Sequence, residues 1–102
     1  MEEGTEATLI AFCGMALSKW GFEAQMDVAV EELLELGKAI LKYRREPTPQ
    51  RARHIAEEMA DVTIMMKQVE IAMSSRHKDF DEWIDDEMYR KLQRLSIMLN
   101  QP

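Results

Sequence analysis

Two pairs of acidic residues in this 102-residue chain have the type and spacing needed for chemistry. Glu32 and Glu35 are three residues apart, and Glu58 and Asp61 repeat that spacing further along the chain. On a helix, residues three apart share one side, and like charges there destabilise the helix unless something positive binds. Oxygen ligands without sulfur or imidazole favour Mg²⁺, with Mn²⁺ as the alternative, and such ions bridge to substrate phosphates. The two pairs therefore predict a divalent metal site, although either pair alone also fits a solvated helix face.

The elements that carry these pairs are predicted to be helices. No segment combines alternating polarity with β-branched residues and flanking turns, so no strand is expected. Breaks at Gly21, at residues 46–50 and at residues 74–81 divide the chain. We expect an all-α, four-helix protomer with helices at 5–19, 23–45, 51–74 and 80–99, and a single domain over residues 1–102. Short connections make neighbouring helices antiparallel, which brings the two acidic pairs together.

The second and third helices each carry an apolar stripe when residues are placed at about 100° intervals. The stripe of the second helix is predicted to contain Met26, Ala29, Val30, Leu33, Leu36, Gly37, Ile40 and Leu41. The stripe of the third is predicted to contain Ile55, Met59, Val62, Met65, Met66, Val69 and Met73. Glu58 points between Met65 and Val69 on the latter stripe. A carboxylate facing a core has to be protonated, to have a basic partner, or to bind a cation.

The overall composition restricts the partners and the compartment. With 19 acidic and 13 basic residues, the net charge of −6 disfavours binding to a nucleic-acid polymer. The longest apolar run, residues 7–17, is too short to span a membrane, and the acidic residues before it do not fit a signal peptide. The only cysteine, Cys13, has no partner within the chain and is expected to be a small buried residue. This predicts a reducing, cytoplasmic location.

Three segments, WGFEAQMDVAVEELLELGKAILKYRRE, HIAEEMADVTIMMKQ and RKLQRL, carry a family resemblance. Together they resemble the MazG-like all-α nucleoside triphosphate pyrophosphohydrolases, relatives of the dimeric dUTPases, the dCTP pyrophosphatases and phosphoribosyl-ATP pyrophosphohydrolase. The resemblance covers about residues 19 to 95. The family pattern is ExxE, a spacer, ExxD, and a downstream Lys with a neighbouring Arg, which correspond here to the two acidic pairs and to Lys91 with Arg94. Some members carry a second Arg where this chain has Leu95.

The resemblance implies Mg²⁺-dependent hydrolysis of a (deoxy)nucleoside triphosphate to the monophosphate and pyrophosphate, for nucleotide-pool house-cleaning or control. The metal would be held by Glu32, Glu35, Glu58 and Asp61. Such an ion neutralises phosphate charge and activates a water, and one carboxylate of the first pair, Glu32 or Glu35, would take the proton of that water. The resemblance also implies a homodimer or a homotetramer.

Substrate contacts are expected from two further regions. Lys91 and Arg94 share a helix face and suit phosphate oxygens, although they also fit the charge preference of a helix C-terminus. Trp20 and Gln25 lie where relatives place base-contacting residues, although Trp20 also fits a packing role at the Gly21 turn. A different class of function, a noncatalytic helical oligomer acting as a nucleotide-binding or adaptor module, is the alternative to the enzyme.

Overall fold

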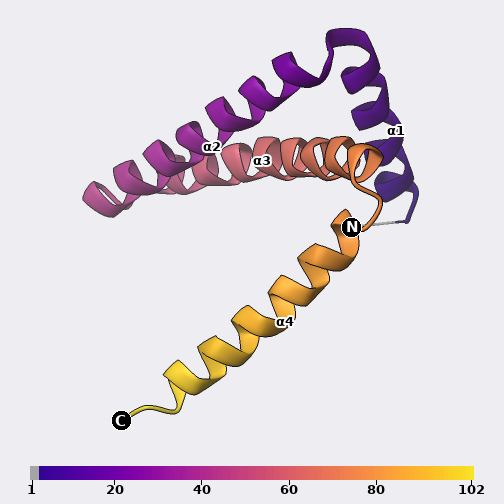
Figure 1. Ribbon diagram of the computed structural model, residues 1–102. Coiled ribbons are helices and arrows are strands. Elements are labelled where there is room, and N and C mark those ends of the chain that lie inside the picture. Colours follow the sequence, from indigo (N-terminus) through magenta and orange to yellow (C-terminus); the bar gives the residue numbers. More distant parts are fainter. Residues whose placement is uncertain (1–2) are drawn as a thin grey trace. The chain divides into compact units, whose positions relative to one another are not determined.

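The computed structural model describes residues 3–102, which form four helices and no strand (Figure 1). The helices are α1 (Glu3–Trp20), α2 (Phe22–Arg45), α3 (Pro49–Arg76) and α4 (Phe80–Leu99). The predicted all-α class and the four helices are confirmed, with each boundary within two residues of its expected position. Met1 and Glu2 of the predicted domain lie outside the described residues. The chain divides into two compact units, one ending at Ala72 and the other comprising Met73–Pro102.

The turn between α1 and α2 consists of Gly21 alone. Gly21 has φ of 90°, in the left-handed region that side chains with a Cβ rarely adopt. Its amide donates to the Leu17 carbonyl at 3.0 Å and its carbonyl accepts from the Gln25 amide at 3.1 Å, so both helix ends are closed through this residue. A glycine is therefore needed to reverse the chain in a single residue.

We expect Gly21→Ala to lower the free energy of unfolding by about 1–3 kcal/mol, because φ 90° with ψ 161° is a backbone conformation essentially restricted to glycine. Beyond Gly21 and its two chain neighbours, no atom lies within 4 Å of the position that a Cβ would take, so the cost comes from the local backbone. Gly14→Ala, in the interior of α1 and equally free of clashes, is the control and should stabilise the protein by about 0.5–1 kcal/mol. Urea denaturation of both variants checks this, and equal effects at the two glycines would contradict it.

The connection between α2 and α3 is short and is closed by a helix cap. The Thr48 hydroxyl accepts a hydrogen bond from the Arg51 amide at 3.2 Å, and Pro49 occupies the first position of α3, where its missing amide hydrogen is not needed. The short connection makes α2 and α3 neighbours, and Figure 1 shows them running alongside each other.

The inner faces of α2 and α3 follow a spacing of alternately three and four residues. The buried and half-buried positions on this pattern are Gln25, Ala29, Glu32, Leu36 and Ala39 in α2, and Ile55, Glu58, Val62, Met65, Val69 and Ala72 in α3. This is the spacing of two helices that pack along a narrow contact line. Glu32 and Glu58 each occupy a position on this line that an apolar residue would normally fill.

The predicted apolar stripes are wider than the faces that the protomer buries. Within the described chain, several residues of the predicted stripes are exposed rather than buried: Val30, Leu33, Ile40 and Leu41 in α2, and Met59 and Met66 in α3. A single protomer therefore buries only part of each predicted stripe. The reason is geometric, because a single neighbouring helix covers a narrower arc than the one over which α2 is apolar.

Helix α1 packs against α3 through a small contact. The Cys13 thiol is buried and donates to the Ile64 carbonyl at 3.6 Å, which confirms the prediction that Cys13 is a small buried residue. Burial raises the pKa of this thiol, and the nearby positive charge of Lys67 opposes that shift in part. Lys67 also lies 3.5 Å from Glu6 and 2.8 Å from Glu70, so one cation joins α1 to α3.

The second unit contains the last turn of α3 and the whole of α4. The Ser74 hydroxyl donates to the Asp81 carboxylate at 3.1 Å. The ring centres of His77 and Phe80 lie 5.9 and 6.4 Å from the ring centre of Trp83. Within α4 the residues from Asp81 onward are exposed.

Over residues 3–102, none of the helices has the combination of length and apolar character that crossing a bilayer requires.

Candidate metal centre

Three of the four predicted carboxylates come together between α2 and α3. Glu32 of α2 and Glu58 and Asp61 of α3 each offer one oxygen, and these oxygens lie within 4.8 Å of one another. Glu32 and Glu58 are half-buried, whereas Asp61 is exposed. The antiparallel pairing of the two helices produces this grouping, because it places the middle of α2 beside the first half of α3. We call these three residues the acidic cluster.

The acidic cluster shifts the titration of Glu32. Partial burial raises the pKa of this carboxyl, and the negative charges of Asp61, Glu58 and Glu35 raise it further. A hydrogen bond with Asp61 acts in the same direction. These are the effects expected where several carboxylates share a small region without a cation, and a bound divalent ion would reverse them.

Glu58 is the most deeply placed member of the acidic cluster. Its side chain is 12% exposed, and its Oε1 lies 3.6 Å from Nε2 of His54, one turn earlier on α3. Its other oxygen, Oε2, is buried and has no hydrogen-bond partner among the described residues. Leaving such an acceptor unsatisfied costs free energy, and an oxygen-seeking cation would satisfy it. The donor set therefore fits Mg²⁺ or Mn²⁺.

Glu35, the fourth predicted ligand, lies outside the acidic cluster. It is one turn beyond Glu32 on α2, its side chain is half exposed, and its Oε1 is 3.5 Å from Nζ of Lys38. Glu35 still acts on the cluster, since its charge contributes to the raised pKa of Glu32. The structure thus separates the four carboxylates into three that converge and one that faces solvent beside a lysine.

Lys91 and Arg94, the predicted phosphate-binding residues, are exposed on α4 in the second unit. The alternative explanation for them was charge complementation at a helix C-terminus. Helix α4 continues to Leu99, however, and its last turn contains no basic residue. The macrodipole effect is confined to the last turn of a helix. Both residues precede that turn, and the charge of Lys91 acts on Glu87 one turn earlier on the same helix.

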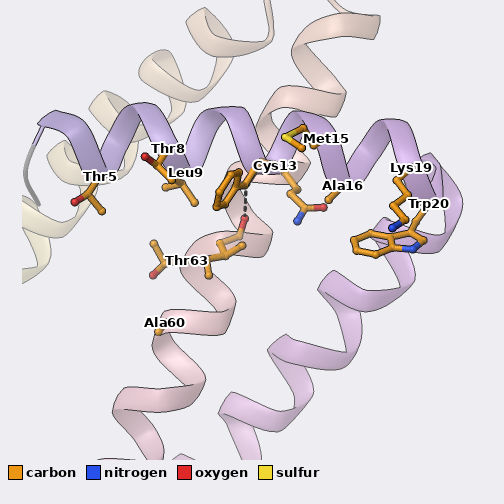
Figure 2. A pocket seen from close by; sticks show the side chains of 13 residues that line it. Thr5, Thr8, Leu9, Cys13, Met15, Ala16, Lys19, Trp20, Ala60 and Thr63 are labelled. Carbon is orange, nitrogen blue, oxygen red and sulfur yellow. Dashed lines mark hydrogen bonds between the residues drawn. The ribbon is translucent and has the colours of Figure 1, made fainter.

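The predicted base-contacting residues, Trp20 and Gln25, are placed apart. Gln25 is buried on the inner line of α2, 7% exposed. Trp20, 58% exposed, lines a pocket of about 780 Å³ formed by α1 and α3 (Figure 2), and Gln25 is not among the residues that line it. We call this the α1–α3 pocket. Its walls include Leu9, Phe12 and Trp20 from α1, and Thr63, Ile64 and Gln68 from α3.

Two residues that the sequence did not single out contribute to these sites: His54 at the acidic cluster and Gln68 in the α1–α3 pocket. Nδ1 of His54 lies 3.4 Å from Glu57, and its Nε2 faces Glu58. The spacing of four residues between His54 and Glu58 is the sequence signal that could have identified this contact. Gln68 lines the α1–α3 pocket and is 5% exposed, but a glutamine seven residues after Asp61 carries no signal by itself.

Comparison of the chain with protein-family models, with curated proteins and with solved structures found no match in any of the three.

Adding Mg²⁺ is expected to raise the melting temperature, and to raise it more as pH rises through the elevated pKa of Glu32, because a metal ligand has to be deprotonated. In the metal-free protein, the contribution of Glu32 to stability changes with pH in the opposite direction. A carboxyl whose pKa is raised by folding stabilises the folded state at low pH, and this contribution is lost as pH rises through the raised value. Thermal melts across a pH series with and without Mg²⁺ check both signs. Glu32→Gln, which cannot titrate, should flatten both dependences, and an unchanged pH dependence in that variant would contradict the assignment.

Proposed function

We propose that this chain is a Mg²⁺-dependent nucleoside triphosphate pyrophosphohydrolase of the MazG-like type. The observation that carries the proposal is the convergence of Glu32, Glu58 and Asp61 between two antiparallel helices, with one Glu58 oxygen buried and unpartnered. Two of these acidic side chains occupy positions on an otherwise largely apolar contact line, where they oppose folding unless a cation is present. An adaptor protein has no evident need for that arrangement, whereas a phosphate-processing enzyme does.

The chemistry assigned to the residues follows from their surroundings. Glu32, Glu58 and Asp61 would hold the ion, which when bound would supply charge neutralisation for the phosphates and a lowered pKa for water. Glu35 lies outside the acidic cluster, where the ion would not bind its carboxylate, and this carboxylate would accept the proton of the attacking water in place of its contact with Lys38. The water oxygen bonds to phosphorus as the anhydride bond between the α- and β-phosphates breaks, and pyrophosphate leaves with the electron pair of that bond.

Lys91 and Arg94 of α4 keep the phosphate-binding role that the family resemblance implies. Lys91 is a compact cation and Arg94 offers a planar fork of donors, and both types of side chain bind phosphate oxygens. These contacts would be common to all triphosphates and would set affinity rather than base preference.

We also propose that the active form is a homo-oligomer, a dimer or a tetramer. Among the described residues, the buried apolar side chains are few and mostly small: Cys13, Ala29, Ala39, Met65 and Ala72. Large apolar side chains of α2 and α3 are exposed beside them, and α4 adds an exposed row formed by Ile84, Met88, Leu92 and Leu95. Chains of this size bury too little surface alone to leave such faces uncovered, and a second copy offers the same apolar faces in return.

The test is an assay of pyrophosphate and monophosphate release from the canonical and several modified nucleoside triphosphates, with Mg²⁺ and with a chelator. Release of both products in the presence of Mg²⁺ and its loss on chelation are the expected results. Nucleotide binding without product release across the whole panel would overturn the enzyme and favour the noncatalytic module.

A further inference from the structure

We infer that Gln68 is the residue that hydrogen-bonds the base of the nucleotide, within the α1–α3 pocket. That the ligand is a nucleotide rests on the proposed function. Where its base binds rests on the residues of the α1–α3 pocket, which are not those of the acidic cluster. The starting point is an unsatisfied group. The Gln68 side-chain oxygen is buried, has no hydrogen-bond partner among the described residues, and belongs to a side chain that lines the pocket.

The pocket has the composition of a site for a flat, mainly apolar ligand. Its volume of about 780 Å³ lies within the range of about 300–1,000 Å³ typical of small-molecule sites. Such sites combine apolar walls with few polar groups that fix the orientation of the ligand. Gln68 is a polar wall residue that is almost fully buried, and its free oxygen would accept a ligand N–H once the side chain turns toward the pocket.

The α1 side of the pocket supplies aromatic surface and a positive charge. Phe12 and Trp20 are 64% and 58% exposed, which leaves ring surface available for stacking against a base. Nζ of Lys19 lies 5.5 Å from the centre of the Trp20 ring (Figure 2). A cation beside an aromatic wall suits a ligand that has a planar ring at one end and phosphate at the other.

The position of Gln68 on α3 relates the pocket to the acidic cluster. Ala60 lines the pocket and directly precedes Asp61, so the two features adjoin on one helix. Gln68 is seven residues beyond Asp61, which is about 10 Å along the helix axis. A nucleotide whose phosphates lie at the acidic cluster therefore has the length to place its base edge at Gln68.

The test measures the binding of four deoxynucleosides, which carry no phosphate, in the absence of metal. Each is compared with an analogue whose base lacks the N–H of its base-pairing edge, because that group has been removed or methylated. Binding is measured by calorimetry and by ligand-observed NMR up to millimolar concentration. We expect the unaltered protein to bind at least one parent deoxynucleoside about tenfold more tightly than its analogue, the usual effect of a buried hydrogen bond. This comparison needs no variant, so it does not depend on whether a substitution folds.

Gln68→Met then removes the amide while keeping the length of the side chain. We expect Gln68→Met to bind the parent nucleoside and its analogue equally. Removing the N–H from the ligand then has no further effect once the amide has been removed from the protein, so the two changes are not additive. The melting temperature of Gln68→Met without ligand should be unchanged or higher, because an unsatisfied buried oxygen has been removed. Gln50→Met, at an exposed glutamine on the same helix, should keep the preference for the parent nucleoside.

Three results would overturn the inference: no deoxynucleoside binds, the preference for the parent persists in Gln68→Met, or Gln68→Met changes the oligomeric state without changing nucleoside binding. The last result would mean that a second copy of the chain occupies the pocket. The failure of the proposed function is distinguishable, because it appears as absent pyrophosphate release, whereas nucleoside binding involves neither phosphate nor metal.

Discussion

Glu58→Gln is expected to lower Mg²⁺-dependent pyrophosphate release by about 10²–10³-fold, while the free energy of unfolding of the metal-free protein stays unchanged or rises. The activity should fall because a neutral amide is a poor ligand for a hard cation, and the charge stabilisation that the ion supplies amounts to several kcal/mol. The stability should not fall because the substitution removes one negative charge from the acidic cluster. An enzyme that loses turnover while its apo form keeps or gains stability is typical of a functional, rather than a structural, carboxylate.

The matched control for this substitution is the neighbouring residue. Glu57→Gln makes the same chemical change one position earlier, at a side chain that is 64% exposed and that also contacts His54. We expect Glu57→Gln to retain most of the activity. Steady-state kinetics and urea denaturation of both variants provide the measurements. A large loss of apo stability in Glu58→Gln, with activity per folded molecule retained, would instead make Glu58 the structural partner of His54.

Leu33→Glu is expected to convert the proposed oligomer to monomer at micromolar concentration and to lower activity with it. In the protomer Leu33 is 46% exposed, so a glutamate there meets water and leaves the fold of the single chain intact. In an oligomer that buries this face, each copy would have to bury an added charge without a partner, which costs several kcal/mol per site. Sedimentation over a dilution series measures the change.

The control for Leu33→Glu places the same charge on the opposite side of the same helix. Ala24 is exposed and lies among the polar residues of α2, away from the apolar arc. Ala24→Glu should therefore leave the oligomeric state unchanged. If the unaltered protein sediments as a monomer at all concentrations, or if Leu33→Glu leaves a stable oligomer intact, the exposed face of α2 does not form the interface.

The helices of this protein could be predicted because their determinants are local. Gly21 interrupts the chain where only a left-handed residue allows a one-residue reversal, and Pro49 follows a threonine that caps α3. The apolar period fixes the helical state between these points. The approach of Glu32 to Glu58 and Asp61 could also be predicted, since spacing puts each pair on one side of a helix and a short connection makes the helices antiparallel.

The rotation of each helix about its own axis could not be predicted in the same way. The apolar arc of α2 is wide enough to fit several rotations, and the packing of α3 selects the line through Ala29, Glu32 and Leu36. That choice leaves Leu33 and Ile40 exposed and Glu35 outside the acidic cluster. It also decides that Glu58 is the carboxylate with a buried, unpartnered oxygen.

The sequence by itself thus determined the four helices and their order, because these depend on neighbours within one or two turns. The tertiary structure alone decided which carboxylates converge, that His54 reaches Glu58, and that Gln68 lines a pocket with Trp20. These depend on contacts between residues far apart in the chain, where a rotation of a helix by part of a turn changes every partner. Periodicity gives the direction of a side chain on its helix, but only packing gives what that side chain meets.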